Sequence, residues 1–121
     1  MIKGLGTDIC PAGRWARLID RYGEKAVRRV LHGDEADLLL GGNAQRLPER
    51  MAGRWALREA FGKALGLGLE GWDWRGLRYR DGQLRAEGPL VELLAARGIQ
   101  HLHGSVSHDG GLALAVVILE A

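Results

Sequence analysis

The charged residues Asp8, Glu59 and Lys63 are the first candidates for chemistry. Glu59 and Lys63 share a face with the small Ala52 and Ala56, and Asp8 follows a short glycine-containing strand. Glu59 and Lys63 are four residues apart in a segment whose pattern predicts a helix, so their side chains lie one turn apart on one face. Such a pair is either an exposed ion pair or a carboxylate and an ammonium that hold a cation and a phosphate. Asp8 either caps the helix that follows it or supplies a second carboxylate to the same cation. Magnesium is typically held by one or two carboxylates together with substrate phosphates.

The segment from Ser105 to Asp109 places a histidine, His108, at the end of a predicted strand. A histidine and a hydroxyl in such a place are suited to contact an anion. The order Ser-His-Asp does not predict a hydrolase, because a catalytic triad assembles from distant parts of a fold and the chain lacks a Gly-x-Ser-x-Gly elbow. His101 and His103 share one strand face, but no third metal ligand lies near them in the sequence, so we assign them no role.

A basic helix stripe and a glycine turn are two candidate contact surfaces. Arg14, Arg17 and Arg21 fall within about 60° of arc on a predicted helix, beside an apolar stripe. They are either a solvated face or a surface that docks an acidic helix, where complementary charge steers encounter. Gly66 and Gly68 flank a leucine in a turn that could bring a phosphate or an adenine ring close to the backbone.

Periodicity and turn residues predict the elements that must position these side chains. Alternating and helical patterns follow one another in the order strand, helices, hairpin, helix, hairpin. The expected strands are 1–7, a hairpin pair around Asp81-Gly82, 99–108 and 112–120, and the expected helices are 11–23, 24–31, 34–40, 48–65 and 90–97. This order predicts an α+β fold with an antiparallel sheet packed against a long central helix. Asp8 then falls at a strand-to-helix junction.

Length and composition indicate one domain spanning 1–121, since 46% hydrophobic and 26% charged residues are typical of a globular protein. The formal net charge of +2 does not indicate a nucleic-acid partner, so any anionic partner must be recognised locally. The longest apolar run, 112–119, is less than half of the roughly 20 residues that a membrane-spanning helix needs. The single Cys10 and the absence of a secretory signal core predict a cytoplasmic protein.

Three segments resemble, in order and spacing, the motifs of one family, the holo-acyl-carrier-protein synthases of the 4'-phosphopantetheinyl transferases. Gly-Leu-Gly-Thr-Asp-Ile at 4–9 resembles the N-terminal motif of the family. Gly-Arg-Trp-Ala-Leu-Arg-Glu-Ala-Phe-Gly-Lys-Ala-Leu-Gly at 53–66 resembles its central Arg-Phe-Ala-x-Lys-Glu-Ala-x-x-Lys helix. Ser-Val-Ser-His-Asp at 105–109 resembles its Ser-x-Ser-His turn, so that the resemblance covers essentially the whole chain.

The resemblance implies transfer of 4'-phosphopantetheine from coenzyme A to a serine of an acyl carrier protein, with release of adenosine 3',5'-bisphosphate and with magnesium as the metal. By position, Asp8 and Glu59 match the metal ligands of the family. Lys63 and His108 match contacts to the coenzyme A phosphates, and Arg14 matches a basic residue that faces the carrier protein. The family also forms trimers with sites between subunits, which implies a homotrimer here.

Two departures from the family pattern and one open role accompany this resemblance. Cys10-Pro11 stands where the family usually has polar residues. Arg58 stands where a lysine usually precedes the metal-binding glutamate, and this change keeps the positive charge but alters the reach and the hydrogen-bond geometry of the side chain. Arg54 is a further candidate for the phosphate contacts. Glu59 takes the serine proton either directly or through a bound water, and we favour the water because a carboxylate on a metal is a poor base.

We expect catalysis to rest on Glu59, Lys63 and His108, with magnesium and cationic side chains neutralising the pyrophosphate. Two other interpretations remain. A non-catalytic module that binds coenzyme A or an acidic protein would need Lys63 and the arginines, but has no reason to keep both Asp8 and Glu59. A small RNA-binding domain would need an aromatic-rich strand for base stacking, and the chain has one Phe and two Tyr.

Overall fold

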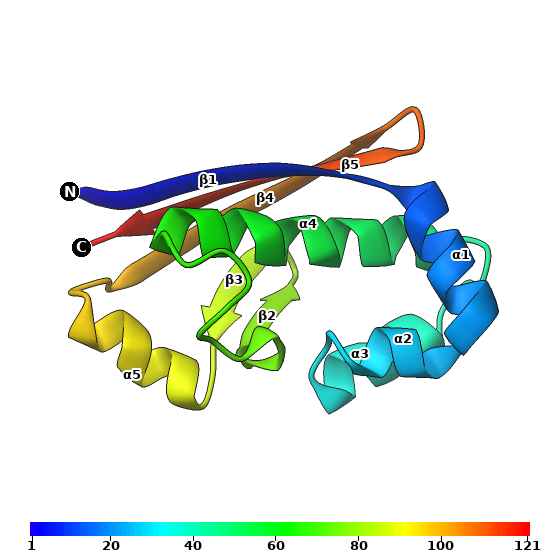
Figure 1. Cartoon of the computed structure of the whole chain (residues 1–121), viewed down its shortest axis with the longest axis horizontal. Helices are drawn as coiled ribbons and strands as arrows, with labels where there is room; N and C mark the ends of the chain where they lie inside the picture. Colours follow the sequence, from blue (N-terminus) through cyan, green and yellow to red (C-terminus); the bar gives the residue numbers. More distant parts are fainter.

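A computed structural model describes all residues from 1 to 121 (Figure 1). The helices are α1 (Ala12–Tyr22), α2 (Glu24–Arg28), α3 (Gly33–Leu40), α4 (Leu47–Leu65) and α5 (Pro89–Ala96), with a short 3-10 helix at Trp74–Gly76. The strands are β1 (Ile2–Pro11), β2 (Leu77–Arg80), β3 (Gln83–Ala86), β4 (His101–Asp109) and β5 (Leu112–Glu120). None of the helices combines the length and the apolar character that crossing a membrane requires.

α4 is the central element of the fold. A three-stranded sheet runs along one side of it, and the other helices and the β2–β3 hairpin lie on the opposite side (Figure 1). The strand order is β1-β5-β4, and both pairings are antiparallel. Ala113, Ala115 and Val117 on the inner face of β5 are fully buried where the sheet meets α4. The α+β fold with an antiparallel sheet on a long central helix is therefore confirmed.

β1 lies very close to α4 because its glycines face the helix. A Cβ atom added at Gly6 would lie 1.9 Å from the carbonyl oxygen of Ala60, and one at Gly4 would lie 2.1 Å from that of Ala64. No side chain fits in these gaps, so the backbone of β1 rests directly on the backbone of α4. Alternate residues of a strand share a face, so Asp8 points toward α4 from the same side as Gly6.

The limits of α4 follow the residues that favour helix starts and stops. Pro48 lies in its first turn, where a missing N–H costs nothing. Gly66 ends it in the left-handed conformation, with φ 77° and ψ 12°, which glycine adopts without steric cost. The helix expected over 48–65 is thus confirmed within one residue. The hairpin is also confirmed: Asp81 and Gly82 have φ values of 52° and 74°, as a two-residue turn between twisted strands requires.

Two expected boundaries were wrong. β1 continues to Pro11 instead of ending at residue 7, because it stays paired with β5 as far as Leu112. Asp8 therefore lies inside a strand and not at a strand-to-helix junction, and α1 has Pro11 at its N-cap with no side-chain cap, so Asp8 does not cap it. The helix expected over 24–31 ends earlier, at Arg28, where α2 gives way to turn residues.

Candidate active site

Asp8 and Lys63 meet between β1 and α4. The Lys63 Nζ donates hydrogen bonds to Oδ1 of Asp8, at 3.1 Å, and to the carbonyl oxygen of Thr7, at 2.9 Å. The Asp8 side chain is 11% exposed, and its Oδ2 is buried without a hydrogen-bond partner. A buried carboxylate oxygen without a partner is costly unless a ligand completes it. The pair therefore has the features of a binding site, which a surface ion pair lacks.

Glu59 lies beside Asp8, and its pKa is raised from 4.5 to about 7. Burial is the largest cause, the neighbouring Asp8 carboxylate adds to it, and the charges of Arg14 and Lys63 act in the opposite direction. Two carboxyl groups that share a site resist simultaneous ionisation, and a divalent cation would relieve their repulsion. With no third acidic, histidine or cysteine side chain in the group, further oxygen ligands would come from substrate or water.

A cavity of about 710 Å³ opens next to Glu59. Its aromatic part consists of Trp15, Trp55 and Trp74, stacked edge to face with ring centroids 6.1 Å and 5.2 Å apart. Arg14 from α1 also lines it. The remaining lining residues are Leu18, Tyr22, Lys25, Ala26, Arg29 and Val30. The cavity thus connects Glu59 to the basic side of α1 through apolar surface.

The arginine stripe of α1 consists of Arg14, Arg17 and Arg21. All three are exposed, and none forms an ion pair with a carboxylate. The guanidinium of Arg21 lies over the ring of Tyr22, 5.2 Å from its centroid. Arg17 and Arg21 therefore leave their charge available to an acidic partner, while the charge of Arg14 also acts on Glu59.

His108 lies on the other flank of α4. His108 of β4 and Cys10 of β1 both pair with Ala113 of β5, so β5 lies between them. The backbone of His108 is therefore two strand spacings, each of about 4.8 Å, away from β1. Its ring packs on α4 at Gly53, where an added Cβ would lie 3.2 Å from Cε1. Its Nδ1 is 3.9 Å from a carboxylate oxygen of Glu49. A single chain therefore does not bring His108 together with Lys63.

Arg54 and the glycine turn occupy two further places on α4. The guanidinium of Arg54 lies 5.2 Å from the centroid of the Tyr79 ring, and its Nε is buried without a partner. Burial lowers the pKa of this guanidinium. The N–H groups of Gly66, Leu67 and Gly68 donate to carbonyls at the end of α4, so they are already engaged. Space remains open outside the two glycines, where an added Cβ would meet nothing within 4 Å.

Two features of the site carry little signal in the sequence. Trp15, Trp55 and Trp74 form one wall only because three separate elements converge, and their spacing along the chain does not indicate it. Arg58 is fully buried, whereas its type and its place next to Glu59 favour an exposed cation. Its spacing of three residues from both Trp55 and Phe61, which puts it on an apolar side of the helix, is the one signal that could have indicated burial.

Comparison with known proteins finds similar proteins over nearly the whole chain. The family model of the 4'-phosphopantetheinyl transferase superfamily matches residues 4–117. A holo-[acyl-carrier-protein] synthase from Thermus thermophilus is 37% identical, covering 100% of this chain and 95% of the relative. Among solved structures, the holo-[acyl-carrier-protein] synthase from Neisseria meningitidis superposes with a TM-score of 0.90 at 29% identity, over 100% of both chains.

A further similar structure was solved with a ligand. The holo-(acyl-carrier-protein) synthase from Bacillus anthracis, in complex with CoA (3',5'-ADP), has a TM-score of 0.78 at 30% identity. The match covers 100% of this chain and 98% of that one.

Proposed function

This chain belongs to the 4'-phosphopantetheinyl transferase superfamily, and we propose that it transfers 4'-phosphopantetheine from coenzyme A to a serine of an apo acyl carrier protein. It is accordingly an enzyme of the holo-[acyl-carrier-protein] synthase class. The observation that carries the proposal is the group of Asp8, Glu59 and Lys63, of which Glu59 lines a cavity that reaches the basic face of α1.

Asp8 and Glu59 are the residues that would hold Mg²⁺. The unpartnered Oδ2 of Asp8 and the raised pKa of Glu59 both fit a site made for a cation. Hard carboxylate oxygens are the protein ligands that magnesium prefers, and one or two of them suffice when substrate phosphates complete the set. Bound there, the metal supplies neutralisation of the pyrophosphate charge.

The reaction is a phosphoryl transfer in which the carrier-protein serine oxygen attacks the β-phosphorus of coenzyme A. The bond to the adenosine-bearing phosphate breaks, and adenosine 3',5'-bisphosphate leaves with the electron pair. Lys63 stabilises negative charge on the phosphates, because its ammonium extends from the helix beside Asp8 with 56% of its side chain exposed. The serine proton passes through a bound water, which Glu59 orients, to the Glu59 carboxylate.

Coenzyme A would be held by Lys63, His108 and Arg54, with the Gly66 and Gly68 turn open to close approach of the ligand. The separation of His108 from Lys63 by α4 favours a site made by two subunits. The outer face of the sheet supports association, because Leu5, Ile9, Leu112 and Leu114 there are 62%, 57%, 46% and 41% exposed. We propose a homotrimer in which this apolar face is covered, acting in the cytoplasm.

The carrier protein would dock on the stripe Arg14, Arg17 and Arg21. An acidic helix placed there brings its serine toward Glu59 and its apolar side chains toward the cavity, which Leu18 and Tyr22 of α1 line. Exposed complementary charges accelerate encounter, and the apolar contacts then contribute to affinity.

Mass spectrometry of an apo acyl carrier protein, incubated with this protein, coenzyme A and magnesium, tests the function directly. The expected result is a carrier protein heavier by one phosphopantetheine group on its serine, and no change when that serine is replaced by alanine. Binding of coenzyme A without any transfer would contradict the proposal and support the non-catalytic binding module.

A further inference from the structure

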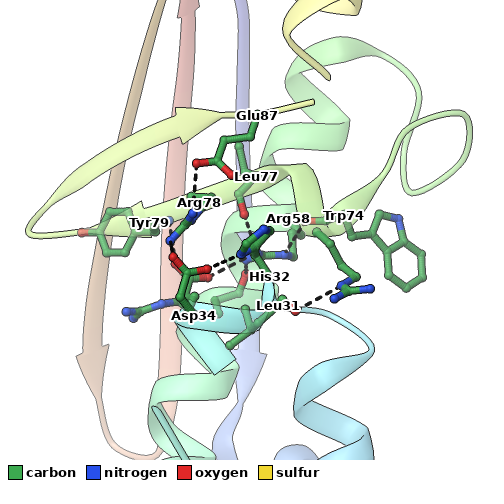
Figure 2. A network of polar contacts seen from close by, with 12 residues as sticks. Leu31, His32, Asp34, Arg58, Trp74, Leu77, Arg78, Tyr79 and Glu87 are labelled. Carbon is green, nitrogen blue, oxygen red and sulfur yellow. Dashed lines mark hydrogen bonds and ion pairs between the residues drawn. The ribbon is translucent and has the colours of Figure 1, made fainter. Parts of the chain in front are cut away.

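Arg58 precedes Glu59 on α4, yet its guanidinium is fully buried and points toward the β2–β3 side of the helix. Its Nε donates to the carbonyl oxygen of Trp74 at 3.1 Å, and its Nη2 donates to that of Leu77 at 2.6 Å (Figure 2). Its Nη1 donates to the carbonyl oxygen of Arg54 at 2.9 Å. Three carbonyls in different directions fix both the place and the plane of the guanidinium.

The charge of Arg58 has a more distant partner. Oε1 of Glu35 is 3.5 Å from Nη2, and Oε2 of Glu35 accepts a hydrogen bond from the backbone N–H of Tyr79 at 2.9 Å. Burial lowers the pKa of Arg58 to about 10, which leaves it protonated at neutral pH. The short bonds of Arg58 thus go to backbone carbonyls, and the carboxylate mainly compensates its charge.

Trp74 connects this network to the cavity. Its backbone carbonyl accepts from Arg58, while its indole packs edge to face on Trp55 and donates from Nε1 to the carbonyl oxygen of Leu69 at 2.8 Å. Trp55 and Trp74 line the same cavity as Glu59. A shift of the chain at Trp74 would therefore change the shape of the cavity without touching the carboxylates.

We propose that Arg58 is a positioning residue that holds Trp74 in place as one wall of the cavity where the carrier protein binds. The inference rests on the proposed function, because it assigns the cavity to the carrier protein. A planar guanidinium reaches several carbonyls at once, whereas a lysine ammonium is a compact donor on a flexible stem. Arg58→Lys keeps the charge and loses the simultaneous hold on Trp74 and Leu77.

Three variants separate positioning from stability. Arg58→Lys is expected to raise the KM for the carrier protein about tenfold, to leave coenzyme A affinity unchanged and to alter the near-ultraviolet circular dichroism of the tryptophans. Glu35→Gln removes the charge partner and retains the carbonyl bonds, so it should lower the urea midpoint of unfolding without changing KM or the spectrum. Arg78→Lys is the matched control, because Arg78 ties the same hairpin to Asp34 of α3 without contacting Trp74.

The kinetics of each variant are measured under conditions in which its urea unfolding curve shows that it is folded. A merely structural Arg58 would reduce the active fraction and leave KM unchanged. The proposal would be overturned if Arg58→Lys left the KM for the carrier protein and the tryptophan spectrum unchanged. It would also be overturned if Glu35→Gln changed both as much as Arg58→Lys does. If the wild-type protein modifies no carrier protein, the proposed function fails, while the spectra still decide whether Arg58 holds Trp74.

Discussion

At the scale of single residues, the candidate active site is marked by the electrostatic conflict between Asp8 and Glu59. The negative charge of Asp8 disfavours ionisation of Glu59, and the Lys63 ammonium contacts Asp8 from one side only. Such a pair contributes little to folding and is well suited to a divalent cation. The proposed metal site accounts for the placing of this pair beside α4.

Loss of either carboxylate is expected to remove magnesium-dependent transfer. Asp8→Asn and Glu59→Gln keep the size of the side chains and delete one anionic ligand each, so the transfer rate should fall on the order of 100-fold. Rates of carrier-protein modification across a magnesium titration measure this. Glu92→Gln, at an exposed and unpaired carboxylate on α5, is the control. Near-wild-type rates at limiting magnesium in either variant would contradict the metal assignment.

The sequence predicts part of this site for a simple physical reason. Helical spacing alone places Glu59 and Lys63 on one face, because residues four apart are neighbours on any helix. It cannot indicate that Asp8 continues a strand, since that depends on pairing with β5, more than one hundred residues away. Nor can it indicate that α4 separates His108 from Lys63, because only the order of the strands decides which flank each residue occupies.

At the scale of elements, the docking of β1 on α4 depends on Gly6. Gly6→Ala would place a methyl group 1.9 Å from the carbonyl oxygen of Ala60, so strand and helix must separate. We expect the free energy of unfolding to fall by about 3 kcal/mol or more, measured by urea denaturation. Gly33→Ala is the matched control, because an added Cβ there meets nothing within 4 Å, and its effect should stay within about 1 kcal/mol. Equal effects would refute this account of the packing.

The contact between α3 and the hairpin predicts a pH dependence of stability. Hydrogen bonds from Arg78 and from His32 lower the pKa of Asp34 from 3.8 to about 2. The stabilisation is therefore present above pH 3.8 and is lost as the pH falls through about 2. Asp34→Asn should flatten the decline in urea midpoint across this range, whereas Asp20→Asn, at an exposed carboxylate without an ion pair, should not. If the urea midpoint of Asp34→Asn declined as steeply with falling pH as that of the wild type, the contacts of Asp34 would be excluded as the source of the pH dependence.

The elements themselves are largely predictable because their signals are local. Pro48 and Gly66 limit α4, and Asp81-Gly82 makes the hairpin, through conformational preferences that do not depend on the rest of the chain. The length of β1 and the buried state of Arg58 depend on partners distant in the sequence. Those are the features that local patterns miss.

At the scale of the whole molecule, the proposed homotrimer, with a site shared between subunits, predicts complementation. Lys63→Ala and His108→Ala should each be inactive alone, because each breaks every site of its own trimer. In a randomly mixed trimer, half of the chains can supply Lys63 and half can supply His108, so about a quarter of the sites are intact. The transfer rate of the equal mixture should recover to about a quarter of the wild-type value. No recovery, with subunit exchange verified by native mass spectrometry, would place both residues in one subunit's site or outside the site.

The arginine stripe of α1 predicts how the molecule meets its partner. Exposed charges act mainly on encounter, and their reach shrinks from about 14 Å at 50 mM salt to about 4 Å at 500 mM. Arg17→Glu and Arg21→Glu should therefore raise the KM for the carrier protein, flatten the salt dependence of kcat/KM and leave coenzyme A binding unchanged. These positions are preferable to Arg14, whose charge acts on Glu59 directly. Arg80→Glu, at an exposed arginine of the hairpin, is the control. Wild-type kinetics at every salt concentration in both stripe variants would mean that the carrier protein docks elsewhere.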